Sequence, residues 1–264
     1  TDDTQTTLVF FNQRREGSRG WFEYGAYYRS LEDDYDFNRL DFETGEPGSF
    51  EHETKVSAVG FQGLQRTGKV AWRFGGQFSK DELVRSTDLT NGPFADRTYA
   101  TVTLIPSVDV PLADGSVLTW RAGITSDYSN RDGSRILPLA GLSLSQERVS
   151  GSTTWELEYA ATSQLPGYTA LASNPDGLFG GNPLLGRETA KQLSASVTHV
   201  KARWQLRATL FARRDDNLVD WTYASDAPFS RQANPVDLDV AGFEAFLAHT
   251  WGDIDVAAGV AWLD

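Results

Sequence analysis

Val70-Ala71-Trp72-Arg73-Phe74-Gly75-Gly76-Gln77-Phe78 alternates between apolar and polar residues, and this alternation indicates an all-β protein. In an extended strand, side chains at every second position share a face. One face therefore carries Val70, Trp72, Phe74 and Phe78, while the other carries Ala71, Arg73, Gly75 and Gln77. The pattern predicts a β-strand with one apolar face and one polar face.

The same two-residue period recurs along the chain. It is found at 118–125, 154–162, 204–210 and 254–262, with Phe211 as an exception on the polar face. The polar faces carry charges as well as neutral groups. A β-sandwich, with one face packed inward and one facing water, would produce the same alternation.

Turn lengths distinguish between these architectures. Short turns are predicted near Gly17–Gly20, Thr67–Gly68, Asp114–Gly115, Ser150–Gly151, Lys201–Ala202 and Gly252–Asp253. Long polar loops are predicted at 36–51, 84–96, 127–135, 163–187 and 216–237. Short turns at one end of the sheet and long loops at the other are typical of an outer-membrane β-barrel. We therefore expect an all-β, antiparallel, up-and-down transmembrane barrel with about twelve strands in this chain.

Composition narrows the range of binding partners and indicates how much of a domain the chain contains. The net charge of -12 and the pI near 4.7 argue against nucleic acid as a partner, because phosphate binding needs clustered Lys and Arg. The absence of Cys excludes thiol chemistry and disulfides. The sequence has no Met, and both of its ends read as strands, so we expect 1–264 to be a partial barrel domain that lacks the first and last strands.

Residues 163–264 resemble the C-terminal half of TonB-dependent outer-membrane receptors. The resemblance is carried by Asn182-Pro183-Leu184-Leu185-Gly186-Arg187-Glu188-Thr189, Asp216-Asn217-Leu218-Val219-Asp220-Trp221, Val240-Ala241-Gly242-Phe243-Glu244 and Ala257 to Asp264. Residues 1–162 match in rhythm only. Within these motifs we expect Arg187 to pair with Glu188 and Gly242 to permit a close backbone approach.

The resemblance implies a barrel of about 22 strands, closed by a plug domain outside this chain. It further implies a receptor in the Gram-negative outer membrane that takes up a scarce nutrient, of the vitamin B12 or iron–siderophore class. Its partners would be outer-membrane lipid, the small-molecule ligand and TonB, which would supply energy through the plug. Two alternatives remain open: a passive porin-like barrel, favoured by an inward-folded loop, and a soluble β-sandwich or propeller that binds carbohydrate.

Ligand contacts are expected in the long loops, where polar and aromatic residues vary on a rigid scaffold. The candidates are Tyr168, Asn174, Phe179, Asn182, Trp221, Tyr223, Phe229 and Arg231. The same aromatic residues could instead pack the loops against one another.

Chemistry of other kinds has little support in the sequence. The three histidines are scattered, and phosphate-loop and nucleophile-elbow motifs are missing, so we expect neither an enzyme nor a cofactor. Asp33, Asp34 and Asp36 lie in the densest run of oxygen ligands and are a candidate calcium site, although a solvated charge run at a strand end is the stronger explanation because no glycine-anchored ligand loop follows.

Overall fold

The computed structural model describes residues 2–36, 49–87, 89, 95–174, 179–223 and 230–264. The strands are β1 (Asp2–Gly17), β2 (Gly20–Asp36), β3 (Ser49–Thr67), β4 (Val70–Ser86), β5 (Asp96–Pro111), β6 (Val117–Ser129), β7 (Gly133–Arg148), β8 (Gly151–Gln164), β9 (Phe179–Gly180), β10 (Glu188–Lys201), β11 (Trp204–Thr222), β12 (Arg231–Trp251) and β13 (Ile254–Leu263). One short helix, α2 (Tyr168–Ala172), lies between β8 and β9.

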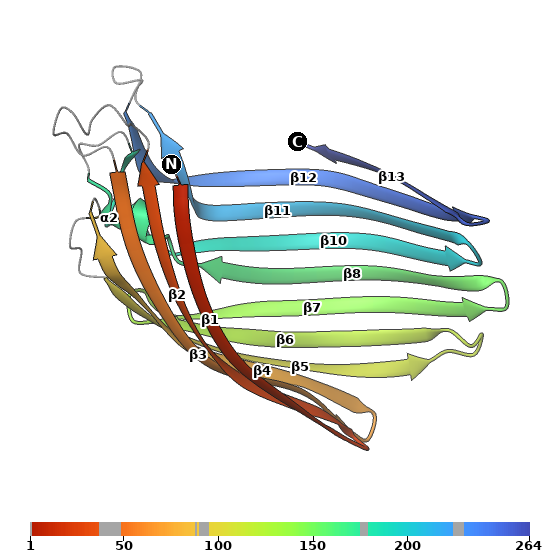
Figure 1. Cartoon of the computed structure of the whole chain (residues 1–264). Coiled ribbons are helices and arrows are strands. Elements are labelled where there is room, and N and C mark those ends of the chain that lie inside the picture. Colours follow the sequence, from red (N-terminus) through yellow and green to blue (C-terminus); the bar gives the residue numbers. More distant parts are fainter. Residues whose placement is uncertain (1, 37–48, 88, 90–94, 175–178, 224–229) are drawn as a thin grey trace.

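Twelve strands follow one another in a single antiparallel sheet in chain order, while the two-residue β9 pairs in parallel with β12. The predicted up-and-down meander of about twelve strands is confirmed. Figure 1 shows the sheet curving from β1 to β13, with α2 near the end where the long connections lie. Within the described residues β1 and β13 pair only with β2 and β12, so the sheet is not closed.

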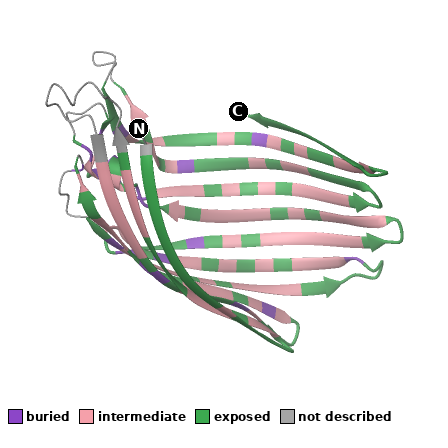
Figure 2. Ribbon diagram, viewed as in Figure 1, coloured by how far each residue is buried: buried purple, intermediate pink, exposed green. Residues whose placement is uncertain are grey.

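The register places apolar residues of neighbouring strands side by side on one face, which we call the outer face. One continuous row across nine strands contains Val70, Val108, Trp120, Leu142, Leu157, Ala195, Leu210, Phe243 and Trp262. Figure 2 shows the long strands as a mixture of exposed and half-buried residues with few buried ones. The apolar row therefore does not form the core of a sandwich.

The opposite, inner face is polar. One of its rows contains Ser107, Arg121, Gly141, Glu158, Ser194, Phe211 and Gly242. Arg121 donates to Glu156 and Glu158 at 2.5 and 2.6 Å. The predicted exception, Phe211, lies on this face beside Gly242. The two faces therefore differ in chemistry from β5 to β12.

Close approach explains the glycine at position 242, as predicted. A Cβ atom added there would lie 2.6 Å from Cζ of Phe211 and 2.9 Å from the backbone oxygen of Trp262. Phe211 thus occupies the space that a side chain at position 242 would need.

One predicted loop is a turn. Residues 127–135 were expected to form a long loop, but β6 continues to Ser129 and β7 begins at Gly133. The turn closes with a bond from the Asp132 amide to the Ser129 hydroxyl (3.0 Å) and with Gly133 at φ +67°. The polar residues that suggested a loop instead extend the polar inner face. The prediction of a long loop at 127–135 was wrong for this reason. The predicted loop at 216–237 was too long, because β11 continues through a bulge after Asp215 to Thr222 and β12 begins at Arg231.

Candidate functional site at the loop end of the sheet

The connection between β8 and β10 lies on the inner face. We call its described parts, residues 165–174 and 179–187, the strap. Tyr168 in α2 contacts Asp81 of β4, whereas Phe179 in β9 pairs with Arg231 of β12. Since β4 and β12 are well separated in a curved sheet, a segment that reaches both crosses its concave side (Figure 1). The polar face is therefore the concave face.

The first anchor of the strap lies on β4 and β5. Arg97 and Asp81 are opposite each other and form a bidentate ion pair, with N–O distances of 3.0 and 2.8 Å. Arg97 also donates to the carbonyl of Pro166 at 2.8 Å, and its guanidinium lies 3.7 Å from the centre of the Tyr168 ring. The Tyr168 hydroxyl donates to Asp81. One buried arginine thus holds the N-terminal end of the strap.

Tyr168 is held in its neutral form by this environment. Burial is the main cause that raises its pKa well above the ordinary value, and the hydrogen bond to Asp81 adds to it. A neutral hydroxyl can donate to the carboxylate, whereas a phenolate could not.

The second anchor lies on β6 and the turn that follows. Nη1 of Arg187 lies 2.7 Å from Oδ2 of Asp127, and the same oxygen accepts from the hydroxyl of Ser163 at 2.6 Å. Nη2 of Arg187 donates to the Ser129 hydroxyl (3.2 Å) and the Gly133 carbonyl (3.1 Å). The Arg187 side chain is only 2% exposed. The expected pairing of Arg187 with Glu188 was wrong. Arg187 pairs with Asp127 instead, because its side chain turns toward β6 before β10 begins.

A neighbouring arginine supports the same end of the strap. Arg131, in the turn between β6 and β7, donates to the carbonyls of Leu185 and Pro183, the latter at 3.3 Å. These carbonyls belong to the Asn-Pro-Leu-Leu stretch of the family motif. The motif thus supplies acceptors for a buried arginine.

The third anchor is apolar and lies on β11 and β12. Ala170 and Leu171 of α2, Leu185 and Ala233 form a buried cluster against which Ala172, Val219 and Trp221 pack. Phe179 meets Trp221 edge to face, with ring centres 5.4 Å apart. Polar contacts therefore hold the strap on one side of the sheet, and apolar contacts hold it on the other.

The predicted ligand residues fall into two groups. Tyr168 and Asn182 stabilise the strap. The backbone N–H of Asn182 donates to the Ala170 carbonyl (2.7 Å), and its side-chain Oδ1 accepts from the backbone N–H of Leu184 (3.0 Å). Phe179 and Trp221 pack against each other, although Phe179 remains 46% exposed. The exposed candidates are Asn174, Tyr223 and Arg231, while Phe229 lies outside the described residues.

Sequence reasoning missed the residues that hold the site together. Asp81, Arg97, Asp127 and Arg131 lie on strands or turns of the polar face, where any one of them resembles a solvated charge. The available signal was Arg187, a charged residue that directly follows an apolar Leu-Leu-Gly stretch in the family motif. Its partner, 60 residues earlier, could not be recognised from spacing.

The calcium candidates lie in β2 and not in a loop. Asp33 accepts a bond from Thr4 (3.2 Å), and Asp34 lies 3.7 Å from Arg85. Because neighbouring strand residues point to opposite faces, Asp33 and Asp34 do not converge. No group of three or more metal-ligating side chains is found in the described part of the chain, and nothing is described of the Asp36 side chain.

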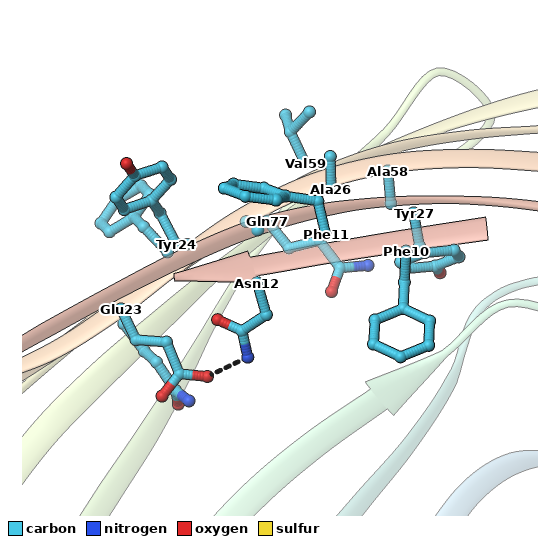
Figure 3. A pocket seen from close by; sticks show the side chains of 15 residues that line it. Phe10, Phe11, Asn12, Glu23, Tyr24, Ala26, Tyr27, Ala58, Val59 and Gln77 are labelled. Carbon is cyan, nitrogen blue, oxygen red and sulfur yellow. Dashed lines mark hydrogen bonds between the residues drawn. The ribbon is translucent and has the colours of Figure 1, made fainter. Parts of the chain in front are cut away.

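A separate hollow of about 360 Å3 lies along β1 to β4. Figure 3 shows Phe10, Asn12 and Glu23 on one side of β1, with Asn12 donating to Glu23 at 2.7 Å, and Phe11 on the other side. The hollow is open to solvent, and its lining mixes apolar side chains such as Phe10 and Phe61 with the polar Gln62 and Gln77. It is therefore not a polar site like the one at the strap.

No helix among the described residues has both the length and the apolar character needed to cross a membrane. None of the curated proteins compared with this chain is similar to it in sequence.

Solved structures with the same fold include a siderophore receptor and two metal transporters. The siderophore receptor PirA from Pseudomonas aeruginosa superposes with a TM-score of 0.74 at 14% identity, covering 99% of this chain and 50% of that one. The copper transporter OprC gives 0.64 at 14% identity, covering 98% and 46%. The FrpB iron transporter from Neisseria meningitidis gives 0.62 at 13% identity, covering 98% and 43%. The chain thus spans half the length of these structures or less.

A family model described as "TonB dependent receptor-like, beta-barrel" matches residues 1–264. The match includes the first 162 residues, for which the sequence offered only a rhythm of strands. Together with the curved meander, the apolar outer row and the polar inner face, it confirms the predicted family. The chain belongs to the TonB-dependent receptor family and forms part of its β-barrel domain.

Proposed function

We propose that this chain is part of an outer-membrane receptor that takes up a scarce nutrient of the iron–siderophore or vitamin B12 class, energised through TonB. The observation that carries the proposal is the strap: a loop fixed across the inner face of a barrel wall whose outer face is apolar. Family membership supports uptake, and the siderophore, iron and copper cargoes named for similar structures support a metal-containing ligand.

The outer face supports a position in the membrane. Along β11 it carries Trp204, Leu206, Ala208, Leu210 and Ala212, followed by Arg214. These nine positions match the ~9–11 residues that a tilted strand needs to cross a bilayer. The charged residues that follow would lie at the membrane surface on the side of the loops.

The rest of the receptor would complete the wall. TonB-dependent transporters of this size have about 22 strands around a plugged lumen, so twelve strands are about half of the wall. We propose that further strands pair with β1 and β13 and that a plug domain makes the contact with TonB. An unpaired strand edge favours association, which agrees with this arrangement.

Ligand contact is assigned to the exposed residues where the strap meets β12. Arg231 is exposed and has no ion pair within the described part of the chain, so it offers a positive charge to an anionic ligand. Phe179 is the register partner of Arg231, and Tyr223 follows Thr222, the partner of Gln232. Asn174 follows Ser173, whose carbonyl accepts a hydrogen bond from Gly181 of the strap. Tyr168 and Asn182 support this surface from within the strap.

The charged contact can be tested directly in cells. Arg231→Ala should weaken binding of the matching ferric siderophore or cyanocobalamin by roughly tenfold, the equivalent of one charge-assisted hydrogen bond. Arg203→Ala, in a short turn at the other end of the sheet, is the matched control and should bind normally. Equal binding by both variants would remove Arg231 from the site.

A passive porin is the second candidate, because the strap is an inward-folded loop of the kind that would narrow a pore. The two functions differ in their energy source. A receptor binds its ligand without TonB but accumulates it only when TonB and the proton gradient are present. Uptake that continues unchanged in cells without TonB would favour the porin.

A further inference from the structure

We infer that Asp127 and Arg187 are positioning residues for ligand binding, because their ion pair, together with the hydrogen bond from Ser163 to Asp127, holds the base of the strap against the barrel wall. As far as ligand affinity is concerned, this inference rests on the proposed function. Neither residue would touch the ligand. They would act by fixing the position and direction of the far end of the strap, the part around Phe179 that pairs with β12.

The geometry of the strap base is the main evidence. Ser163 is the last but one residue of β8, and Arg187 is the last residue of the strap before β10. Both donate to the same oxygen of Asp127, at 2.6 and 2.7 Å. Asp127 is on β6, two strands away from β8, so its carboxylate pulls the base of the strap inward over β7. The carboxylate of Asp127 therefore joins the end of β8 to the end of the strap and fixes the direction in which the strap leaves the wall.

Burial makes this contact stiff and directional. Arg187 and Asp127 have side-chain exposures of 2% and 13%. Nη1 of Arg187 also donates to the Ser163 hydroxyl at 3.1 Å, and Nη2 donates to Ser129 and Gly133. Its Nε atom has no hydrogen-bond partner in the described structure. If the carboxylate were lost, a buried guanidinium would lack its counter-charge, and the strap would have to move to hydrate it.

The far end of the strap cannot set its own direction in this way. It packs on β11 and β12 through the apolar cluster and the Phe179–Trp221 contact, and its backbone pairing with β12 covers only two residues. Apolar contacts are non-directional and tolerate sliding. The surface around Phe179 is therefore positioned by the polar anchors of the strap, of which the Asp127–Arg187 pair is the one at its base.

The test combines a loosened strap with a tether that restores its position. Asp127→Asn keeps the size of the side chain and removes its charge, and Arg187→Lys removes the fork of donors. If the strap is in place only a tenth of the time, the apparent Kd for the ligand rises about tenfold. Asp109→Asn, which faces the inner side of β5 near a short turn, is the matched control.

The tether is a pair of cysteines at Leu89 and Ser173, which form an antiparallel bridge and are both buried. Cα atoms opposite each other in antiparallel strands are about 4.5–5.5 Å apart, within the range of a disulfide. The chain has no cysteine of its own, so this pair can be oxidised selectively. It fixes the strap at a point between the base and the far end.

We expect the oxidised Leu89→Cys/Ser173→Cys pair to restore ligand binding to the Asp127→Asn receptor, and reduction to abolish the rescue. In the receptor without ligand, Asp127→Asn should also expose the strap to protease, while Asp109→Asn should not. Failure of the tether to rescue binding by a folded barrel would overturn the positioning role. Greater protease exposure with no binding of any siderophore or cobalamin, even by the unmodified receptor, would contradict the proposed function alone.

Discussion

Arg97 and Asp81 face each other across β5 and β4, and the ion pair between them lies beneath the ring of Tyr168, whose centre is 3.7 Å from the guanidinium. Three groups from two strands and the strap thus share one small polar site. The strap supplies both a hydroxyl donor and a carbonyl acceptor to the pair. This arrangement joins the wall of the barrel to the element that carries the candidate ligand residues.

Removing the hydroxyl of Tyr168 should loosen the strap slightly. Tyr168→Phe deletes the bond to Asp81 but keeps the ring on Arg97, so we expect a loss of about 1 kcal/mol in strap docking. Tyr168→Ala also removes the ring and should cost more, because the cation–π contact and apolar burial are lost as well. Rates of limited proteolysis within the strap measure both effects, with intact β-barrel signal as the control. Identical rates for the two variants would contradict the role of the ring.

Alkaline pH should weaken the same contact. The folded pKa of Tyr168 is raised above the value of about 10 for an unfolded chain, because burial and Asp81 disfavour the phenolate. The stability that Tyr168 contributes is therefore fully present below pH ~10 and is lost as the pH rises toward the folded pKa. The difference in tyrosinate absorbance between the native protein and Tyr168→Phe should stay near zero through pH ~10. A difference of about half a tyrosinate at pH ~10 would show that Tyr168 ionises like a solvated tyrosine.

The two faces of the sheet should respond differently to charge. Trp120→Arg or Leu157→Arg on the outer face should destabilise the barrel by roughly 2–4 kcal/mol if the residue lies near the bilayer midplane. Arg121→Ala or Glu156→Ala on the inner face breaks a partly exposed ion pair and should cost about 1 kcal/mol or less. Unfolding of the lipid-embedded receptor in denaturant measures the difference. Equal tolerance at both sets of positions would argue against a membrane barrel.

Gly242 should be the less replaceable of two inner-face glycines. Gly242→Ala places a Cβ atom 2.6 Å from the Phe211 ring and 2.9 Å from a backbone oxygen, so we expect a loss of about 1–3 kcal/mol from overpacking. At Gly75 the nearest atom would be 3.4 Å away, an ordinary contact, and Gly75→Ala should fold normally. Detergent refolding yields of the two variants test the prediction. A normal yield for Gly242→Ala would mean that the neighbouring strands can separate there.

The orientation of the barrel follows from its turns. In intact cells, an impermeant thiol reagent should label Tyr223→Cys, since this exposed position lies at the loop end of the sheet. Asp253→Cys, in the short turn between β12 and β13, should be labelled only after the outer membrane is permeabilised. The opposite pattern would invert the barrel in the membrane.

Local pattern was sufficient to predict the strands and their faces. The alternation at 70–78 placed Val70 and Trp72 on the apolar side and Arg73 on the polar side, and cross-strand register then joined such residues into continuous rows. This works because the side-chain period of a strand is exact, so each residue reports its own face. The local pattern failed at 127–135, because the polar residues of the inner face are of the same types as those found in loops.

The residue pattern alone was enough to predict a meander with one apolar face, one polar face and long connections at one end of the sheet. Only the tertiary structure decided that the connection between β8 and β10 folds inward and that Arg187 meets Asp127. Sixty positions separate those two residues, and the sequence between them carries no period that reports their distance. The pairing depends on the curvature of the sheet, because only a curved wall brings β6 beneath a segment that also reaches β4 and β12.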